Sequence, residues 1–346
     1  MHMADALISP VVGGAMWAAT AGLATYAAKK VQQDIDDRKI PLMGVLGAFV
    51  FAAQMINFTI PATGSSGHLG GGLLLAILLG PYAAFLTIAS VLTIQALFFA
   101  DGGLLALGCN IFNLGFFPCF IAYPFIYKPL AGKQLTQGRL CLAAVLAAVI
   151  SLQLGAFSVV LDTVFSGISN LPFSAFVILM QPIHLAIGLV EGLVTAAVIL
   201  FVAKEAPEIL TKTAQGQRLG NIAVKPVLVT LLIAAMITGG ALSWFASNSP
   251  DGLEWSIASV TGTDELEAPD GIHGILAGLQ EKIAFLPDYN FKQEEQPVAT
   301  EANAHETPAW PSVDTGTSVA GIAGSLLTLI FAFAIGKGLQ RFAKQP

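Results

Sequence analysis

The chain has 346 residues, of which 55% are hydrophobic and only 11% are charged, and its mean hydropathy is +0.74. Soluble domains carry about 25% charged residues, so this composition excludes an ordinary soluble protein and predicts an integral membrane protein. The formal net charge of −6 is a local property, because 13 of the 22 acidic residues fall between positions 247 and 316.

Apolar stretches predict the membrane segments. A helix needs around 20 residues to cross a hydrocarbon core, and suitable stretches lie near 10–28, 40–60, 103–127, 140–161, 174–203, 226–246 and 318–336. The run from Leu69 to Phe99 is broken by Gly80-Pro81, which indicates one kinked helix or a hairpin of two. Its first part, Leu69 to Leu79, is too short to span alone and is expected to lie inside the bundle.

Basic residues decide between the kink and the hairpin. Of the 16 Lys and Arg residues, 14 lie in four segments, at 29–39, 128–139, 204–225 and 337–344. These segments share the cytoplasmic side only if the region 69–127 crosses the membrane an odd number of times, which a hairpin achieves. We therefore expect nine segments in the cell (inner) membrane, with an extracytoplasmic amino terminus and a cytoplasmic carboxyl terminus.

The fold class follows from these segments. We expect an all-α, multi-span helical bundle of about seven segments, followed by a two-helix C-terminal module with an acidic extracytoplasmic loop. The polar stretch 204–225 is expected to be a linker, which divides the chain into domains 1–215 and 216–346. Within the loop, Asp251 and Glu254 have the spacing of a capping box that starts a helix. The part of the loop through Glu294-Glu295-Gln296-Pro297 has a composition typical of flexible segments.

The amino terminus has the pattern of a metal chelator. The α-amine of Met1, the backbone nitrogen of His2 and its ring nitrogen can close two fused chelate rings around one ion. A fourth nitrogen from His68, which follows Gly64-Ser65-Ser66-Gly67, would complete the tetragonal arrangement favoured by Ni(II) and Cu(II), and Co(II) could use the same donors. The predicted topology places both histidines on the outer face. The sequence lacks the basic start of a cleavable signal peptide, so Met1 is expected to remain.

Other polar residues are candidates for supporting roles. His184 and Glu191 are seven residues apart in an apolar segment, hence on one helical face, and could form a second shell around the ion, an ion path, a partner contact or a satisfied polar pair. Asp5, Asn57 and Ser66 lie near the proposed outer pocket and could orient a histidine. For Asp5 and Asn57, helix-end capping is the alternative.

Two other function classes find less support. The glycine-rich run Gly64 to Gly72 is not followed by the Gly-Lys-Ser or Gly-Lys-Thr of a phosphate-binding loop, so no ATPase activity is expected; its glycines could instead allow close helix approach. An intramembrane metallohydrolase is a weak alternative because the chain has no His-Glu-x-x-His pair. A stand-alone ion-coupled carrier is another, but the chain shows no inverted repeat.

The motifs together resemble a known family. Met1-His2-Met3-Ala4-Asp5-Ala6, Asn57-Phe58, the segment 64–71 and the segment 184–193 look like the CbiM/NikM family of substrate-capture subunits of nickel and cobalt energy-coupling factor transporters. Residues 226–342, with two segments flanking Ser249-Pro250-Asp251-Gly252-Leu253-Glu254, resemble the small N component. The whole chain is thus similar to a fused NikMN-type protein.

The resemblance implies a function and partners. It implies a substrate-binding subunit of an ATP-driven importer for Ni(II) or Co(II), with nickel slightly favoured, that has no enzymatic activity or cofactor of its own. The metal ligands would be Met1, His2 and His68. The partners would be a membrane T component (NikQ/CbiQ-like) and ATPase subunits (NikO/CbiO-like). One departure is Met3-Ala4-Asp5-Ala6-Leu7, where many relatives have an aromatic-containing stretch, so the resemblance does not define the fine shape of the pocket.

Overall fold

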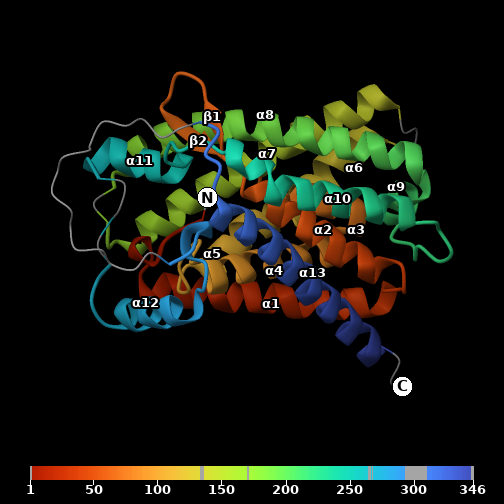
Figure 1. The fold of residues 1–346 in the computed structure, drawn as a ribbon, viewed down its shortest axis with the longest axis horizontal. Coiled ribbons are helices and arrows are strands. Elements are labelled where there is room, and N and C mark those ends of the chain that lie inside the picture. Colours follow the sequence, from red (N-terminus) through yellow and green to blue (C-terminus); the bar gives the residue numbers. More distant parts are fainter. Residues whose placement is uncertain are drawn as a thin grey trace.

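The computed structural model describes residues 2–132, 136–169, 171–263, 266, 268–292 and 310–343. Over these residues the protein is a helical bundle whose long helices run side by side along one axis (Figure 1). Six helices in the described part are long and apolar enough to cross a membrane, and two shorter apolar helices accompany them. The prediction of an all-α membrane protein is confirmed. The flexibility predicted for 294–297 concerns residues outside the described part.

The elements follow the chain in this order. The first half contains η1 (Asp5–Leu7), α1 (Pro10–Asp34), α2 (Lys39–Gln54), β1 (Phe58–Ile60), β2 (Ser65–Gly67), α3 (Gly72–Leu79), α4 (Pro81–Phe99), α5 (Leu107–Ile111), the π-helix η2 (Phe112–Tyr127), α6 (Lys128–Ala131) and α7 (Gln137–Ser166). The second half contains α8 (Phe173–Glu205), α9 (Pro207–Ala214), α10 (Lys225–Gly240), η3 (Leu242–Phe245), α11 (Gly252–Thr261), α12 (Ile272–Ile283), η4 (Pro287–Tyr289) and α13 (Thr315–Ala343).

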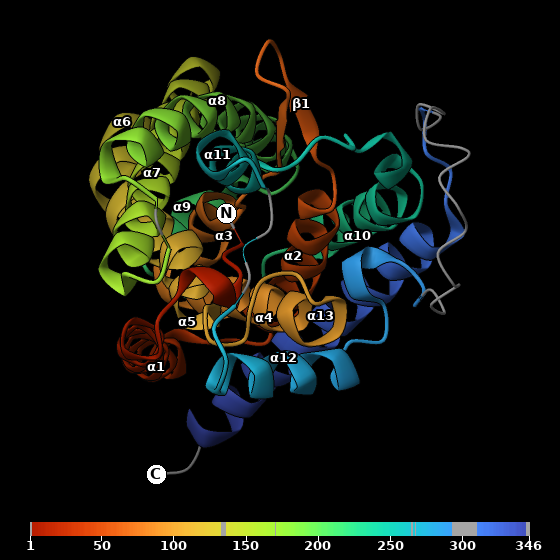
Figure 2. The ribbon, with the colours of Figure 1, turned by 90° about the vertical axis from the view of Figure 1, so that its left-hand side faces the viewer.

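The predicted hairpin at Gly80-Pro81 is present. Gly80 has φ +81°, which glycine adopts without steric cost, and Pro81 begins α4 at a position where no backbone N–H is needed. All of α3 is buried. In the end view α3 lies near the middle of the ring of helices (Figure 2). The short helix therefore lies inside the bundle, as its length predicts.

A small antiparallel hairpin departs from the all-helical expectation. The predicted segment 40–60 ends as a helix at Gln54, and β1 then pairs with β2. The connection between the strands starts with Pro61 and includes Ala62 at φ +65° and Gly64 at φ +79°. Proline and positive φ angles are incompatible with a continuing helix. The predicted segment 226–246 likewise ends earlier, at Gly240.

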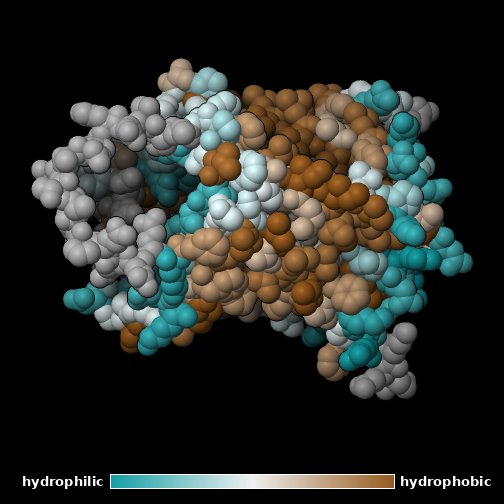
Figure 3. Space-filling view, in the orientation of Figure 1, coloured by the Kyte–Doolittle hydropathy of each residue, from teal (hydrophilic) through white to brown (hydrophobic). Residues whose placement is uncertain are grey.

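The surface has the banded pattern of a membrane protein. On the face seen in Figure 3, an apolar belt covers the middle of the bundle, and polar residues gather at both ends. Exposed leucines and isoleucines repeat every four residues on the outer helices, as at Leu185, Leu189 and Leu193 of α8. The amino terminus, the β-hairpin, α11 and α12 lie toward one end, and α9 and the end of α13 lie toward the other (Figure 1).

Small residues let α10 and α13 pack closely on each other and on the rest of the bundle. A Cβ added at Gly321 of α13 would overlap the backbone oxygen of Gly239 in α10. Likewise, a Cβ at Gly44 of α2 would come within 2.9 Å of the backbone oxygen of Leu329. Close backbone contact through glycine is a common way for helices to associate in membranes. Residues after position 225 are therefore packed into the same bundle as α2.

This packing makes a stability prediction. We expect Gly321→Val to destabilise the protein by about 1–3 kcal/mol or more, because a backbone atom cannot move away from the new side chain. Gly338→Val is the control, since a Cβ at this position of the same helix meets nothing within 4 Å. Thermal unfolding in detergent measures both variants. Equal melting temperatures for the two would contradict the described contact between α10 and α13.

Candidate metal centre

The amino-terminal segment is fixed to the bundle by its backbone. The N–H of Met3 donates to Asn110 Oδ1 over 2.8 Å, and Asn110 Nδ2 donates back to the Met3 carbonyl over 3.2 Å. The same carbonyl accepts the N–H of Gly103 over 2.9 Å. The Met3 side chain is fully buried. These contacts join the first residues to α5 and to the loop before it, and so fix the position of His2.

The segment that carries His68 runs into the bundle without regular structure. After β2, residues 68–71 have no regular secondary structure, and the backbone N–H groups of Gly70 and Gly71 donate to the two oxygens of Glu191 over 2.7 and 3.1 Å. Gln54 Nε2 donates to the carbonyl of Gly70 over 2.8 Å. Irregular backbone at membrane depth is tolerated only where protein satisfies its polar groups. Glu191 and Gln54 supply those partners.

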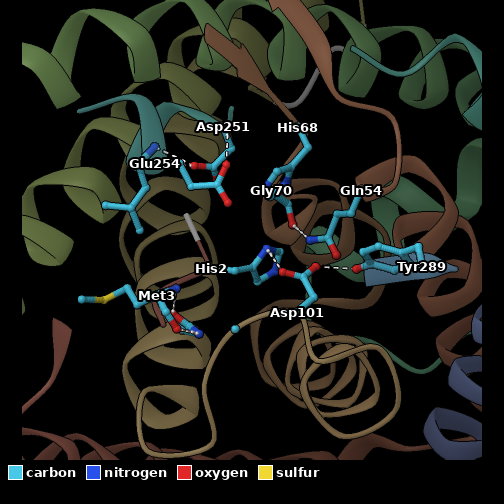
Figure 4. A network of polar contacts seen from close by, with 12 residues as sticks. His2, Met3, Gln54, His68, Gly70, Asp101, Asp251, Glu254 and Tyr289 are labelled. Atoms are coloured by element: carbon cyan, nitrogen blue, oxygen red, sulfur yellow. Dashed lines mark hydrogen bonds and ion pairs between the residues drawn. The ribbon is translucent and has the colours of Figure 1, made fainter. Parts of the chain in front are cut away.

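His2 and His68 meet. Their rings are stacked, with centroids 4.9 Å apart and an angle of 13° between planes. His2 Nδ1 lies 3.2 Å from Asp101 Oδ1, and the hydroxyl of Tyr289 donates to the other Asp101 oxygen (Figure 4). The prediction that the two histidines lie on the same face and close together is therefore confirmed. That they bind a metal stays a prediction.

Both imidazoles are neutral at physiological pH. Burial lowers the pKa of His2 and of His68 to about 3. The contact between His2 and Asp101 has the geometry of an ion pair, but the lowered pKa makes it a hydrogen bond from a neutral Nδ1–H. A neutral imidazole has one ring nitrogen with a free lone pair, which is the form that binds metals.

Two hollows adjoin the paired histidines. A vestibule of about 620 Å³ is lined by His2 and His68, and also by five acidic residues, Asp5, Asp101, Asp251, Glu254 and Asp288. An inner cavity of about 10 Å³, the volume for about one water-sized particle, is lined by His68, His184 and Asp251 among apolar residues. The acidic lining gives the vestibule a negative potential that attracts cations.

The segment before α11 forms one wall of this region. The N–H of Ser66 donates to the Pro250 carbonyl and its hydroxyl to the Ser249 carbonyl, both over 2.8 Å. The predicted capping box is present: Asp251 accepts the N–H of Glu254 over 2.9 Å, and Glu254 accepts the N–H of Asp251 over 2.9 Å. The distant segments 65–68 and 249–254 are thus joined beside His68.

The other predicted site residues have distinct positions. Met1 lies outside the described residues. Asp5 and Asn57 line the vestibule, and Asp5 accepts the N–H of Ala106, just ahead of α5, over 2.9 Å. Neither η1 nor α5 has a side-chain cap, so the capping alternative does not describe Asp5. Ser66 binds backbone rather than a histidine. His184 and Glu191 do not form a pair with each other: Glu191 binds Gly70 and Gly71, and His184 donates to a backbone carbonyl of its own helix.

Sequence reasoning missed three residues of the site. No motif in the sequence points to Asp101, yet its carboxylate contacts His2. Tyr289 gave no signal, because it lies in an irregular stretch. Asp251 had a complete local explanation as a helix cap, which hid its place between the vestibule and the inner cavity.

Side chains alone do not make a complete metal site here. Within the described residues, no group of three His, Cys, Asp or Glu side chains is arranged to hold an ion. The sequence predicts two imidazoles together with main-chain nitrogens at the start of the chain, and this ligand set stays a prediction.

The chain matches two family models. One, described as cobalt uptake substrate-specific transmembrane region (CbiM), matches residues 2–209, and the other, the PDGLE domain, matches residues 225–341. The chain belongs to the CbiM family. Its combination with a PDGLE domain is that of the fused NikMN proteins.

Curated relatives agree with this assignment. A putative fused nickel transport protein NikMN of Archaeoglobus fulgidus is 30% identical over 99% of each chain. The fused nickel transport protein NikMN of Rhodobacter capsulatus is 31% identical over 84% of this chain and 88% of its own. The cobalt transport protein CbiM of Sorangium cellulosum is 30% identical over 61% of this chain and 95% of its own.

A solved structure has the same fold. A transition metal transporter matches with a TM-score of 0.53 and 31% identity, over 59% of this chain and 93% of the other. A truncated form of a transition metal transporter gives the same TM-score at 30% identity.

The contact between Glu191 and the His68 segment is testable. In this CbiM-family chain, Glu191→Leu removes the acceptor of two buried N–H groups, and leaving each unpaired costs about 1–3 kcal/mol. We expect faster hydrogen exchange in the peptide 66–72, measured by mass spectrometry. Glu191→Gln is the matched control, since its remaining oxygen still accepts one N–H. Unchanged exchange in the leucine variant would show that the carboxylate does not hold this segment.

Proposed function

We propose that the chain is the substrate-binding membrane subunit of an importer for Ni(II) or Co(II). The observation that carries the proposal is the stacked pair of imidazoles, His2 and His68, at the edge of an acidic vestibule. The relatives named as nickel or cobalt transport proteins support the same cargo. In this reading the chain catalyses no covalent reaction.

The proposed ligands are Met1, His2 and His68. Only Nδ1 of His2 can close a small chelate ring with its own backbone nitrogen, and in the structure this atom faces Asp101. Metal binding would therefore replace the hydrogen bond to Asp101. His68 is already prepared, because its Nδ1 lies 3.1 Å from the Leu69 carbonyl and donates to it, which leaves Nε2 as the lone-pair donor. With the α-amine of Met1, these donors give four nitrogens, a set that favours nickel.

The proposed orientation places the vestibule on the extracytoplasmic side of the cell membrane. The basic connections then lie in the cytoplasm, as the positive-inside rule requires, and so does the carboxyl terminus. We propose the partners implied by the family resemblance, a membrane T component and ATPase subunits, since the sequence has no phosphate-binding loop of its own. The chain would act as two modules, 1–215 and 216–346, and the second contributes the wall at Asp251.

Metal binding tests the ligand set. We expect His2→Ala and His68→Ala each to weaken Ni(II) and Co(II) binding by at least about 10–100-fold, because each removes an imidazole ligand. One extra residue before Met1 should weaken binding equally, since it displaces the amine. Calorimetric titration of the purified full chain measures these affinities. His273→Gln is the control, because this buried histidine lines neither hollow. Wild-type affinity in both alanine variants would overturn the assignment.

Transport assays separate the importer from the ion-coupled carrier. We expect cells that produce the chain with its T component and ATPases to accumulate Ni(II) or Co(II). A Lys→Ala change in the ATPase phosphate-binding loop should abolish this accumulation, because ATP hydrolysis would supply the energy. Concentrative uptake by the chain alone, varying with an ion gradient, would instead favour the carrier.

A further inference from the structure

His184 is a buried histidine, and one of its two ring nitrogens has no hydrogen-bond partner among the described residues. It is 1% exposed, on the inward face of α8. Its Nδ1 lies 2.8 Å from the Met180 carbonyl, which can only accept a hydrogen bond, so Nδ1 carries the proton. Nε2 then has a free lone pair, and among the described residues it has no hydrogen-bond partner. An unpaired acceptor in a protein interior costs free energy, so its retention needs an explanation.

The inner cavity lies at this ring. It is lined by His184, His68 and Asp251, with Gly67, Gly70 and three apolar side chains among the rest of the wall. Its volume of about 10 Å³ corresponds to roughly one water-sized particle. His273 also leaves a buried ring nitrogen without a described partner, but it lines neither hollow. The cavity is therefore what distinguishes His184.

Two residues line both the cavity and the vestibule. His68 and Asp251 line both of them, whereas His2 lines only the vestibule and His184 only the cavity. An ion held by His2 and His68 would thus already contact a residue, His68, that also lines the cavity at His184. The carboxylate of Asp251 offsets part of the positive charge of a dication in either space.

We propose that His184 and His68 form a second, inner site for a transition-metal dication. The inference rests on the proposed function, since it takes His2 and His68 as the outer site. Because His68 belongs to both sites, the ion would exchange His2 for His184 while one imidazole stays bound. The inner site is then the first position after capture and lies farther from the vestibule along α8.

The neighbouring backbone supports this direction. A Cβ added at Gly67 would overlap the side chain of Ile187, one turn beyond His184, and Gly70 and Gly71 bind Glu191, two turns beyond it. The His68 segment therefore runs alongside α8 from His184 toward Glu191. The inner cavity lies between this segment and α8, and Leu114, Leu152, Asp251 and Gly252 complete its wall.

The test uses His184→Gln in the full chain, with Ni(II) and Co(II) as probes. We expect equilibrium binding by the purified protein to stay near the wild-type value, because the outer ligands are intact. Transport in cells that also produce the T component and ATPases should fall by at least about 10–100-fold, since losing even an outer-shell partner of a metal ligand has an effect of this size. Thr195→Val, a buried change on the same helix outside the cavity lining, is the control for packing.

A second measurement is independent of transport and of folding yield. In the His2→Ala chain the outer site has lost a ligand. We expect weak residual Co(II) binding, seen as a change in Co(II) absorption. Adding His184→Gln to this variant should remove the residual binding. Wild-type transport by His184→Gln, or residual binding unaffected by it, would overturn the inner site. Failure of the wild-type chain to bind either ion would instead overturn the proposed function itself.

Discussion

The contact between Glu191 and two successive glycine amides is the constraint on which the site depends. His68 has to reach the amino terminus, and the chain that carries it has to enter an apolar bundle without helical hydrogen bonds. The two oxygens of Glu191 accept the N–H groups of Gly70 and Gly71, so this backbone is satisfied where water is excluded. Short α3 can then begin at Gly72. After the turn at Gly80, α4 leads the chain back to Asp101 in the wall of the vestibule.

The site is assembled from distant parts of the sequence. The first residues contribute His2, the re-entrant segment contributes His68, and the segment before α11 contributes Asp251. Ser66 joins the last two through backbone contacts to Ser249 and Pro250. The PDGLE part of the chain is therefore a structural component of the pocket, because it contributes Asp251 to the lining.

The sequence predicts the helical segments and the central histidine pair, because both leave regular signals. Hydrophobic length identifies the spans, the basic connections require the hairpin at Gly80-Pro81, and a histidine at position 2 is a recognisable chelator. The partner of Glu191 is not predictable, since a carboxylate that binds backbone amides 120 residues away leaves no pattern. β1 and β2 are three residues each, too short to show alternation. Asp251 is hidden because capping α11 already accounts for it.

The location of the metal tests the account most directly. Crystals of the full chain grown with Ni(II) would give an anomalous difference signal at the nickel absorption edge. The account predicts a peak at coordination distance, about 2 Å, from nitrogens of both His2 and His68, with Asp101 released from His2. A peak at coordination distance from neither imidazole, or from only one of them, would contradict the account.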